Sequence, residues 1–567
     1  MPLGSAFNSL RLLLRNMNPN KPTELPLKHR KHDKAVIFPS DEKIKYLPRS
    51  TPEEHGYTKE YIDSFFREIS SDLSNRVNRI LIVKDNFVIA EKYEYPYVPD
   101  AWDMVFSTTK TVVCLAIGIL YDEGKIDLDA PVYKILGVSP ANIRNKKITF
   151  RHLLTMSTGV TFNEIESATS LTWLKGFFDS GNKFKVGSKF EYNSLNTYIL
   201  SVLVEKLSGM KFEKFIKEKL FNHLDMNSVH LDTSPEGYFK GGWGLYILPE
   251  DMAKLGILIK DKGVYNGERL VSEQWINMMT SIQYEASKYN RRFDYGFQMW
   301  IDKAHDLCFF NGMYNQDILI YNKSGVVVVV CCANNEGFHG STQYDIIAKY
   351  FSTKEMGNFP LCKTYGNRDL ANYDNLMYYY DKIVNKEYKV HSSVANSCGI
   401  LPLLIQNEVG TYARGVKGLK FLKEEDEYVL VMKEGTVDHR IRFNFKNGIR
   451  QTFNFYGNLY DCICDGRFIL SGKGDPFMLI RIYFLEFPST RYISVKFGKD
   501  DNVLSIEESE NPGFDFVMSI INEQDESTKA FVNNIVKTIN PAKLSGTIKN
   551  IFAPVYIAKH GKDKTNG

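Results

Sequence analysis

The sequence predicts an α/β (α+β) chain: a domain with one antiparallel sheet flanked by helices, followed by a separate all-β domain. The chain has 567 residues, too many for one hydrophobic core. We place the first domain at residues 51–365, where strand-like runs near both ends enclose helical segments. We place the second at residues 408–525, where short strand-like runs recur with turn residues between them.

The two ends of the first domain supply its sheet. The runs Ile80–Val83 and Phe87–Ala90 predict two strands that turn at Asp85 and Asn86, and a helix is expected from Glu60 to Ser71. The β-branched run Val326–Val330 predicts a central strand with both faces covered. One sheet made from both ends of the domain is the economical architecture.

The second domain is predicted as an antiparallel barrel, lipocalin-like, or a sandwich. Asn447-Gly448 and Asp465-Gly466 are typical of hairpin turns between its strands. The expected strands are Tyr428–Met432, Ile441–Phe445, Arg467–Leu470, Met478–Phe487 and Arg491–Phe497.

Three segments lie outside these domains. Residues 1–50 form a basic extension, with a Lys/His/Arg cluster at 28–32, and we favour a solvated extension over a surface-binding arm. Residues 366–407 are predicted as a helical connector and residues 526–567 as a lysine-bearing tail.

Composition excludes several classes of protein. The net charge of +4 is too small for general nucleic-acid binding, and no apolar run is long enough to span a membrane. None of the eight cysteines forms a C-x-x-C pair, and there is no His-Glu-x-x-His or phosphate-loop motif, so we expect no metal site and no cofactor. Several cysteines lie in apolar runs, so we favour buried free thiols over disulfides. No signal peptide is recognisable, so we expect a cytoplasmic protein; Arg11 and Arg15 leave an organellar address as the alternative.

The motif Ser-x-x-Lys occurs four times, starting at Ser40, Ser107, Ser180 and Ser208. Only Ser107 precedes a segment that is apolar on all sides, which predicts a buried helix. Ser107 then stands at the first turn of that helix, where free N–H groups and the helix dipole favour negative charge. Lys110 lies on the same helix face, and its burial should lower its pKa toward that of a general base. A serine cap beside a lysine that reaches solvent is the structural alternative.

Several stretches in correct order resemble the serine β-lactamases, the penicillin-binding proteins and their esterase relatives. Val105–Lys110 resembles the nucleophile motif of that family, and Ile148–Gly159 its His-Leu-Leu segment. Phe190–Ser194 resembles its Tyr-x-Asn/Ser motif, followed by a helix. Further signatures are Gly241–Tyr246 with Pro249–Gly256, and Tyr295–Trp300. The resemblance covers residues 52–355 and implies the β-lactamase/transpeptidase fold.

Two features favour the subgroup of esterases and 6-aminohexanoate-dimer hydrolases. The second motif reads Tyr192-x-Ser194, and the third motif, usually Lys-Thr-Gly, is replaced by Gly312–Gln316. This segment resembles the Gly-x-His-Gly-Gln of the subgroup, with Tyr314 and Asn315 substituted. Loss of the lysine removes the usual partner of a β-lactam carboxylate, which disfavours penicillin turnover.

The resemblance implies acyl transfer through a covalent acyl-enzyme. Ser107 is the implied nucleophile, with Lys110 and Tyr192 as general base and acid. Ser194 is implied to contact Lys110, and the amides of Ser107 and Met313 to form the oxyanion hole. Gly312, Tyr314 and Gln316 complete the implied substrate-binding segment. Three structural alternatives stay open: Tyr192 as a core tyrosine, Ser194 as a helix cap and Met313 as a packing residue.

The expected partner is a small-molecule or short-peptide substrate, and a homo-oligomer stays open. A binding protein on the same fold, with little or no turnover, is the second hypothesis, because the third motif is altered. A D-amino-acid peptidase or amidase, with the β-rich domain gating the site, is the third.

Overall fold

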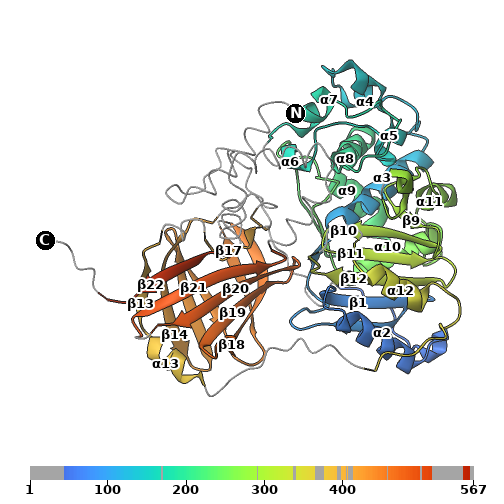
Figure 1. Cartoon of the computed structure of the whole chain (residues 1–567). Helices are drawn as coiled ribbons and strands as arrows, with labels where there is room; N and C mark the ends of the chain where they lie inside the picture. The colour runs from blue at the N-terminus through green and yellow to red at the C-terminus, as the bar shows by residue number, and fades with distance from the viewer. Residues whose placement is uncertain are drawn as a thin grey trace. The chain divides into compact units, whose positions relative to one another are not determined.

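The structure of the chain is a computed structural model (Figure 1). It divides into two compact units, whose described parts lie within residues 44–363 and 376–561. The cluster at 28–32, Ser40 and most of the predicted tail lie outside the described residues. The described residues are 44–167, 170–289, 291–335, 340–363, 376–392, 398–403, 405–406, 413–455, 457–498, 501–513 and 553–561.

The first unit is built on a seven-stranded antiparallel sheet with the strand order β2-β1-β12-β11-β10-β9-β8. The predicted strands at both ends of the domain are confirmed, since β1 pairs with β12 in the interior of this sheet. Asp85 and Asn86 form the turn between β1 and β2 with φ values of 49° and 67°. The strands are β1 (Val77–Lys84), β2 (Phe87–Tyr93), β8 (Asp294–Tyr295), β9 (Trp300–Asp302), β10 (Leu307–Gly312), β11 (Gln316–Tyr321) and β12 (Val326–Cys332).

Helices cover both faces of this sheet (Figure 1). Successive residues of β12 point into two separate hydrophobic cores: Val327 shares one core with residues of α3, α8 and α10, while Val328 shares the other with residues of α2 and α12. This explains why the strand reads as a continuous apolar run. The larger helices are α2 (Lys59–Ser71), α3 (Thr109–Asp122), α8 (Leu195–Ser208), α10 (Pro249–Lys260), α11 (Glu273–Thr280) and α12 (Gln343–Phe351).

Short elements connect these parts. The helical ones are η2 (Glu53–His55), η3 (Phe106–Thr108), α4 (Tyr133–Leu136), η4 (Ile143–Lys147), α5 (Phe150–Leu154), α6 (Glu164–Ser167), α7 (Trp173–Asp179), α9 (Phe212–Ile216), η5 (Lys217–Phe221) and η6 (Ala286–Tyr289). A small sheet has the order β3-β5-β4, and β6 pairs with β7. These strands are β3 (Asp103–Met104), β4 (His230–Leu231), β5 (Leu245–Ile247), β6 (Val264–Tyr265) and β7 (Glu268–Arg269).

The second unit is a ten-stranded antiparallel sheet that curls into a nearly closed barrel, as predicted (Figure 1). Its strand order is β16-β15-β14-β13-β22-β21-β20-β19-β18-β17, and the short helix α13 (Tyr378–Ile383) precedes it. The strands are β13 (Glu387–Val390), β14 (Val416–Glu424), β15 (Glu427–Glu434), β16 (Val437–Phe443), β17 (Ile449–Phe455), β18 (Asn458–Leu470), β19 (Pro476–Phe484), β20 (Ser489–Phe497), β21 (Val503–Asn511) and β22 (Val555–Lys559). β13 and β22 lie in the segments expected as connector and tail.

Both predicted hairpin turns in the barrel are wrong. Asn447-Gly448 lies in the connection from β16 to β17, which are the two edge strands of the order and do not pair with each other. Asp465-Gly466 lies inside β18. A Cβ atom on Gly466 would come within 2.7 Å of the Phe443 ring, so glycine is needed there for close packing. The neighbouring Asp465 accepts a hydrogen bond from Arg481 Nε at 2.7 Å.

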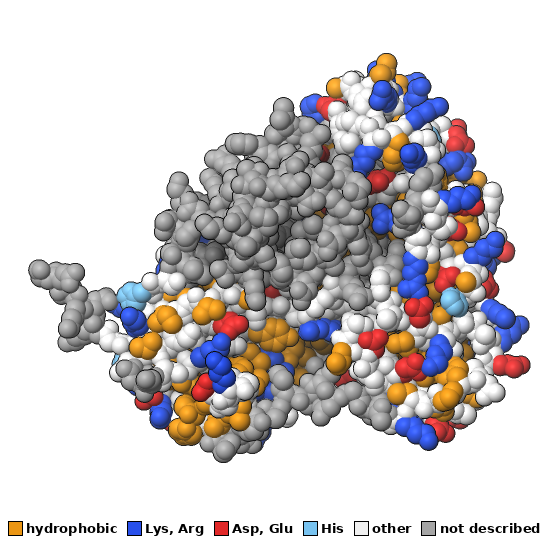
Figure 2. Space-filling view, viewed as in Figure 1, with side chains coloured by type: hydrophobic (Ala, Val, Ile, Leu, Met, Phe, Trp, Pro, Cys, Tyr) orange, Lys and Arg blue, Asp and Glu red, His pale blue; other side chains and the backbone are white. Residues whose placement is uncertain are grey.

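Figure 2 shows how charged side chains are distributed on one face of the described residues. Positive and negative side chains are intermixed on the face in Figure 2, without a continuous field of one sign among the described residues. All eight cysteines are free thiols. Within the described ranges, no helix has both the length and the apolar character that a membrane crossing requires.

Candidate active site

Ser107 lies in the short turn η3, directly before the buried helix α3. Its side chain is only partly buried, whereas α3 is enclosed along almost its whole length. The preceding Phe106 has a φ of 44°, a conformation that is rare for a bulky residue. Strained backbone of this kind clusters at functional sites, where it aims a side chain. The turn therefore presents the Ser107 hydroxyl away from the core.

Lys110 meets Ser107 across one helical turn. Its Nζ lies 2.7 Å from Ser107 Oγ, 3.0 Å from Ser194 Oγ and 2.7 Å from the Gly242 carbonyl oxygen. The Lys110 side chain is 1% exposed, so it does not reach solvent. When neutral, the amine can donate to Gly242 and Ser194 and accept from the Ser107 hydroxyl. This is the geometry that a general base requires.

Burial lowers the pKa of Lys110 to about 7, and the carboxylate of Glu164 partly opposes this effect. The amine is therefore ready to lose its proton near neutral pH. Ser180 and Ser208 differ, because Lys183 pairs with Glu191 at 2.9 Å and Lys211 with Glu205 at 3.0 Å.

This pKa predicts the pH profile of the reaction. We expect kcat/KM to rise with pH through about 7 and then to level off, because the protonated amine cannot accept the serine proton. Glu164→Gln removes a negative charge that favours the protonated amine, so the rising limb should move to lower pH. Glu191→Gln, which removes only the partner of Lys183, should leave the limb in place. An unchanged or raised limb in Glu164→Gln would contradict this assignment.

Tyr192 reaches Ser107 from the other side of the site. Its phenol shares a hydrogen bond with the Ser107 side chain, and its ring centroid lies 4.9 Å from Lys110 Nζ. The ring stacks on Trp300 at 5.6 Å, which fixes its orientation. Burial raises the pKa of Tyr192 well above its usual value, so the phenol keeps its proton at neutral pH. The tyrosine can therefore donate a proton, whereas Lys110 can accept one.

Ser194 stands at the start of α8 without capping it by its side chain. Its hydroxyl contacts Lys110, and its backbone N–H donates to Glu164 Oε1 at 2.7 Å.

The third segment forms the turn between β10 and β11, and three contacts hold it against the nucleophile turn. A Cβ atom on Gly312 would lie 2.4 Å from the Val105 carbonyl oxygen, so only glycine allows this approach. The rings of Tyr314 and Phe106 meet edge to face at 5.2 Å. Thr108 Oγ1 donates to the Gln316 carbonyl oxygen at 2.6 Å.

The amides of Ser107 and Met313 both lie in this region. Neither donates a hydrogen bond to another of the described residues, so both are available to a substrate oxygen. The Gln316 side chain is fully buried and donates to the Cys332 carbonyl oxygen at 2.6 Å. It therefore ties β11 to β12.

Two members of the site had no role in the sequence analysis. Gly242 supplies a carbonyl acceptor to Lys110, and a Cβ atom there would lie 2.6 Å from Ser194 Cβ. The paired glycines 241 and 242 were the available signal. Glu164 has no motif that marks it, since only the fold brings it to Ser194 and Lys110.

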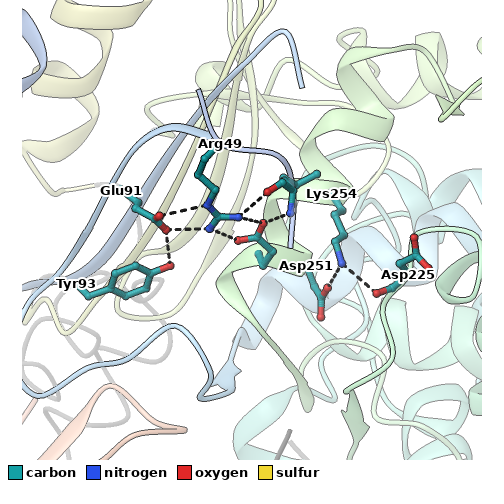
Figure 3. Close-up of polar contacts among 8 residues, drawn as sticks. Arg49, Glu91, Tyr93, Asp225, Asp251 and Lys254 are labelled. Atoms are coloured by element: carbon teal, nitrogen blue, oxygen red, sulfur yellow. Dashed lines mark hydrogen bonds and ion pairs between the residues drawn. The ribbon is translucent and has the colours of Figure 1, made fainter. Parts of the chain in front are cut away.

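One further signature holds the framework together. Glu250 of α10 accepts a hydrogen bond from Arg49, which also donates to Glu91 (Figure 3). In the same helix, Lys254 Nζ donates to Asp251 Oδ1 at 2.9 Å and to the Asp225 carbonyl oxygen at 3.0 Å. This cluster anchors the chain before β1 to the sheet-covering helix. Among the described residues, no group of three His, Cys, Asp or Glu side chains is arranged to hold a metal ion.

The helix-covered antiparallel sheet, with a serine at the start of a buried helix, is the β-lactamase/transpeptidase fold. The family model described as Beta-lactamase matches residues 74–349, so this part of the chain is similar to that family.

Curated relatives include a 6-aminohexanoate-dimer hydrolase of Paenarthrobacter ureafaciens, 25% identical over 225 residues, which are 35% of this chain and 55% of the relative. Protein flp of Staphylococcus aureus (strain COL) is 27% identical over 165 residues, which are 26% of this chain and 33% of the relative. The chain thus spans between a third and somewhat more than half of the length of these two relatives.

Among solved structures, a putative 6-aminohexanoate-dimer hydrolase from Bacillus anthracis is similar, with 16% identity and a TM-score of 0.46. The match covers 54% of this chain and 86% of that one. A D-stereospecific amidohydrolase from Streptomyces sp. matches with 17% identity and a TM-score of 0.42, over 51% of this chain and 99% of that one.

Proposed function

We propose that the protein is a serine hydrolase that cleaves ester or amide bonds through an acyl-enzyme on Ser107. The observation that carries the proposal is the distance of 2.7 Å between the partly exposed Ser107 hydroxyl and the buried Lys110 amine. A lysine with a pKa of about 7 is a base matched to neutral pH, and it needs no metal or cofactor to activate a hydroxyl.

In the acylation step, Ser107 Oγ forms a bond to the substrate carbonyl carbon while its proton passes to Lys110 Nζ. The carbonyl oxygen becomes an oxyanion, which the amides of Ser107 and Met313 stabilise. The bond to the leaving alcohol or amine then breaks, and Tyr192 donates a proton to it. The tyrosine regains that proton from Lys110, so the site ends neutral with an ester on Ser107.

In the deacylation step, water attacks the ester carbon and gives up its proton to the neutral Lys110 amine. The acid product leaves, and the proton returns to Ser107 Oγ. Because burial favours the protonated phenol, we assign the primary base to Lys110 and the proton relay to Tyr192.

The relative named 6-aminohexanoate-dimer hydrolase supports an amide or ester substrate of small size, including a short peptide. The segment Gly312–Gln316, which replaces the Lys-Thr-Gly of the family, contains no lysine that could bind a β-lactam carboxylate. We therefore propose that esters and linear amides are better substrates than β-lactams. D-amino-acid amides remain within this class.

A fluorophosphonate probe tests the proposal, because it reacts only with an activated serine. We expect labelling of the wild type between about pH 7 and 9 and none of Ser107→Ala. A panel of p-nitrophenyl esters, D-amino-acid amides and nitrocefin then ranks the substrates. Absence of labelling at every pH would contradict the proposal and would favour a binding protein for peptide-like ligands on the same fold.

A further inference from the structure

Asp317 is a buried carboxylate directly behind the turn that carries Met313. Its side chain is 0% exposed, and no Lys, Arg or His side chain of the described residues pairs with it. A buried carboxylate without a cation is costly, and it persists only where enough donors surround it. The mechanism proposed above uses no part of this group.

Side-chain amides supply those donors. Asn311 Nδ2 donates to Asp317 Oδ1 at 2.8 Å, whereas Asn315 Nδ2 at 3.3 Å and Gln343 Nε2 at 2.6 Å donate to Oδ2. The Tyr344 hydroxyl also shares a hydrogen bond with this carboxylate. Burial raises the pKa of Asp317 to about 7, so the acceptor form dominates in mildly alkaline solution.

The donors Asn311 and Asn315 stand at the two ends of one turn. Between them lie Gly312, Met313 and Tyr314, and the Asn315 N–H closes the turn onto the Gly312 carbonyl oxygen at 3.0 Å. Tyr314 and Asn315 both have left-handed backbone, with φ values of 65° and 64°. A turn of this kind needs support for its non-glycine residues, and the carboxylate holds both of its ends.

We infer that Asp317 is a positioning residue for the oxyanion hole, acting through Asn311 and Asn315 on the Met313 amide. This inference rests on the function proposed above. The contacts of Gly312 with Val105 and of Tyr314 with Phe106 set the turn against the nucleophile. Asp317 supports the same turn from behind, so a change there moves the amide relative to Ser107. A displacement of about 1 Å at such a donor is enough to slow the reaction strongly.

Asp317→Asn tests this role. The carboxamide keeps the volume but presents an NH₂ group to at least one of the amides that now donate to the carboxylate. In assays at about pH 8.5, we expect kcat to fall about 10- to 100-fold with KM little changed, because oxyanion donors act mainly in the transition state. Inhibition by phenylboronic acid, whose adduct with Ser107 carries an oxygen toward the same amides, should weaken in parallel.

Asp251→Asn is the matched control, since Asp251 is another buried aspartate of this unit, paired with Lys254 at 2.9 Å. It should lower the thermal unfolding midpoint but leave kcat and boronate affinity unchanged. Asn315→Gly is a second variant, which suits the φ of 64° and removes one donor. In this variant kcat should fall several-fold. If Asp317→Asn does not fold, Asn315→Gly alone tests the positioning role.

The outcomes separate the two proposals. If the wild type shows no hydrolysis that depends on Ser107, both the proposed function and the role of Asp317 are overturned. If the wild type is active and both Asp317→Asn and Asn315→Gly keep kcat within about twofold of it, only the positioning role is wrong. A loss in Asp317→Asn that Asp251→Asn reproduces, or one confined to KM, also overturns the positioning role.

Discussion

Replacement of Ser107 by alanine is expected to reduce ester and amide hydrolysis by about 10⁴-fold or more, because no acyl-enzyme can form. The change removes one hydroxyl from a partly exposed turn, so the fold should remain intact. Initial rates at saturating substrate, together with mass spectrometry of the acylated protein, measure the effect. Neither turnover nor a stable acyl adduct should be detectable in the variant.

Ser208→Ala is the control for this substitution, because Ser208 heads another Ser-x-x-Lys sequence. Its hydroxyl donates to the Val204 carbonyl oxygen at 2.7 Å, and its partner Lys211 is engaged by Glu205. Activity of this variant should equal that of the wild type. If Ser107→Ala kept more than about one hundredth of the wild-type rate, the nucleophile would have to be another residue.

Lys110→Met is expected to lower kcat by about 10²- to 10⁴-fold, since methionine fills a similar volume but accepts no proton. Lys110→Arg should be as inactive, because the guanidinium keeps its proton at every accessible pH. The rate of fluorophosphonate labelling of Ser107 reports the activation of the hydroxyl separately from later steps, and it should fall in both variants.

The pH profile supplies the control for Lys110→Met. Whatever activity remains should no longer show the rising limb near pH 7 that the wild-type amine produces. A variant that retained kcat within about tenfold of the wild type, with this limb unchanged, would exclude Lys110 as the base. Circular dichroism and thermal unfolding confirm that the compared proteins are folded.

The central sheet and the pair Ser107 and Lys110 could be predicted from local signals, whereas Tyr192 and Ser194 were predicted from the resemblance to the motifs of a known family. A run of β-branched residues identifies a covered strand, and two residues three positions apart share a helix face wherever that helix lies. The motif order then brought Tyr192 to the same site. These features depend little on the details of tertiary packing.

The remaining features depend on contacts between distant segments. Glu164, the Gly242 carbonyl and Asp317 act through neighbours that only the fold supplies. Asp465-Gly466 has the composition of a turn, yet the approach of Phe443 in the barrel interior makes it part of a strand. The turn preference of the Asp-Gly dipeptide contributes less free energy than this packing, so the dipeptide alone predicts the wrong structure there.

The place of β22 in the barrel constrains how the second unit is made. This strand lies between β13 and β21, so without it the sheet falls into one group of four strands and one of five. Residues 555–559 leave the ribosome after all the other strands of the sheet. Until then, β13 and β21 each present an open edge that can pair with a foreign strand. The barrel can therefore be completed only after residues 555–559 have been synthesised, and pairing of β22 with β13 and β21 then covers both edges.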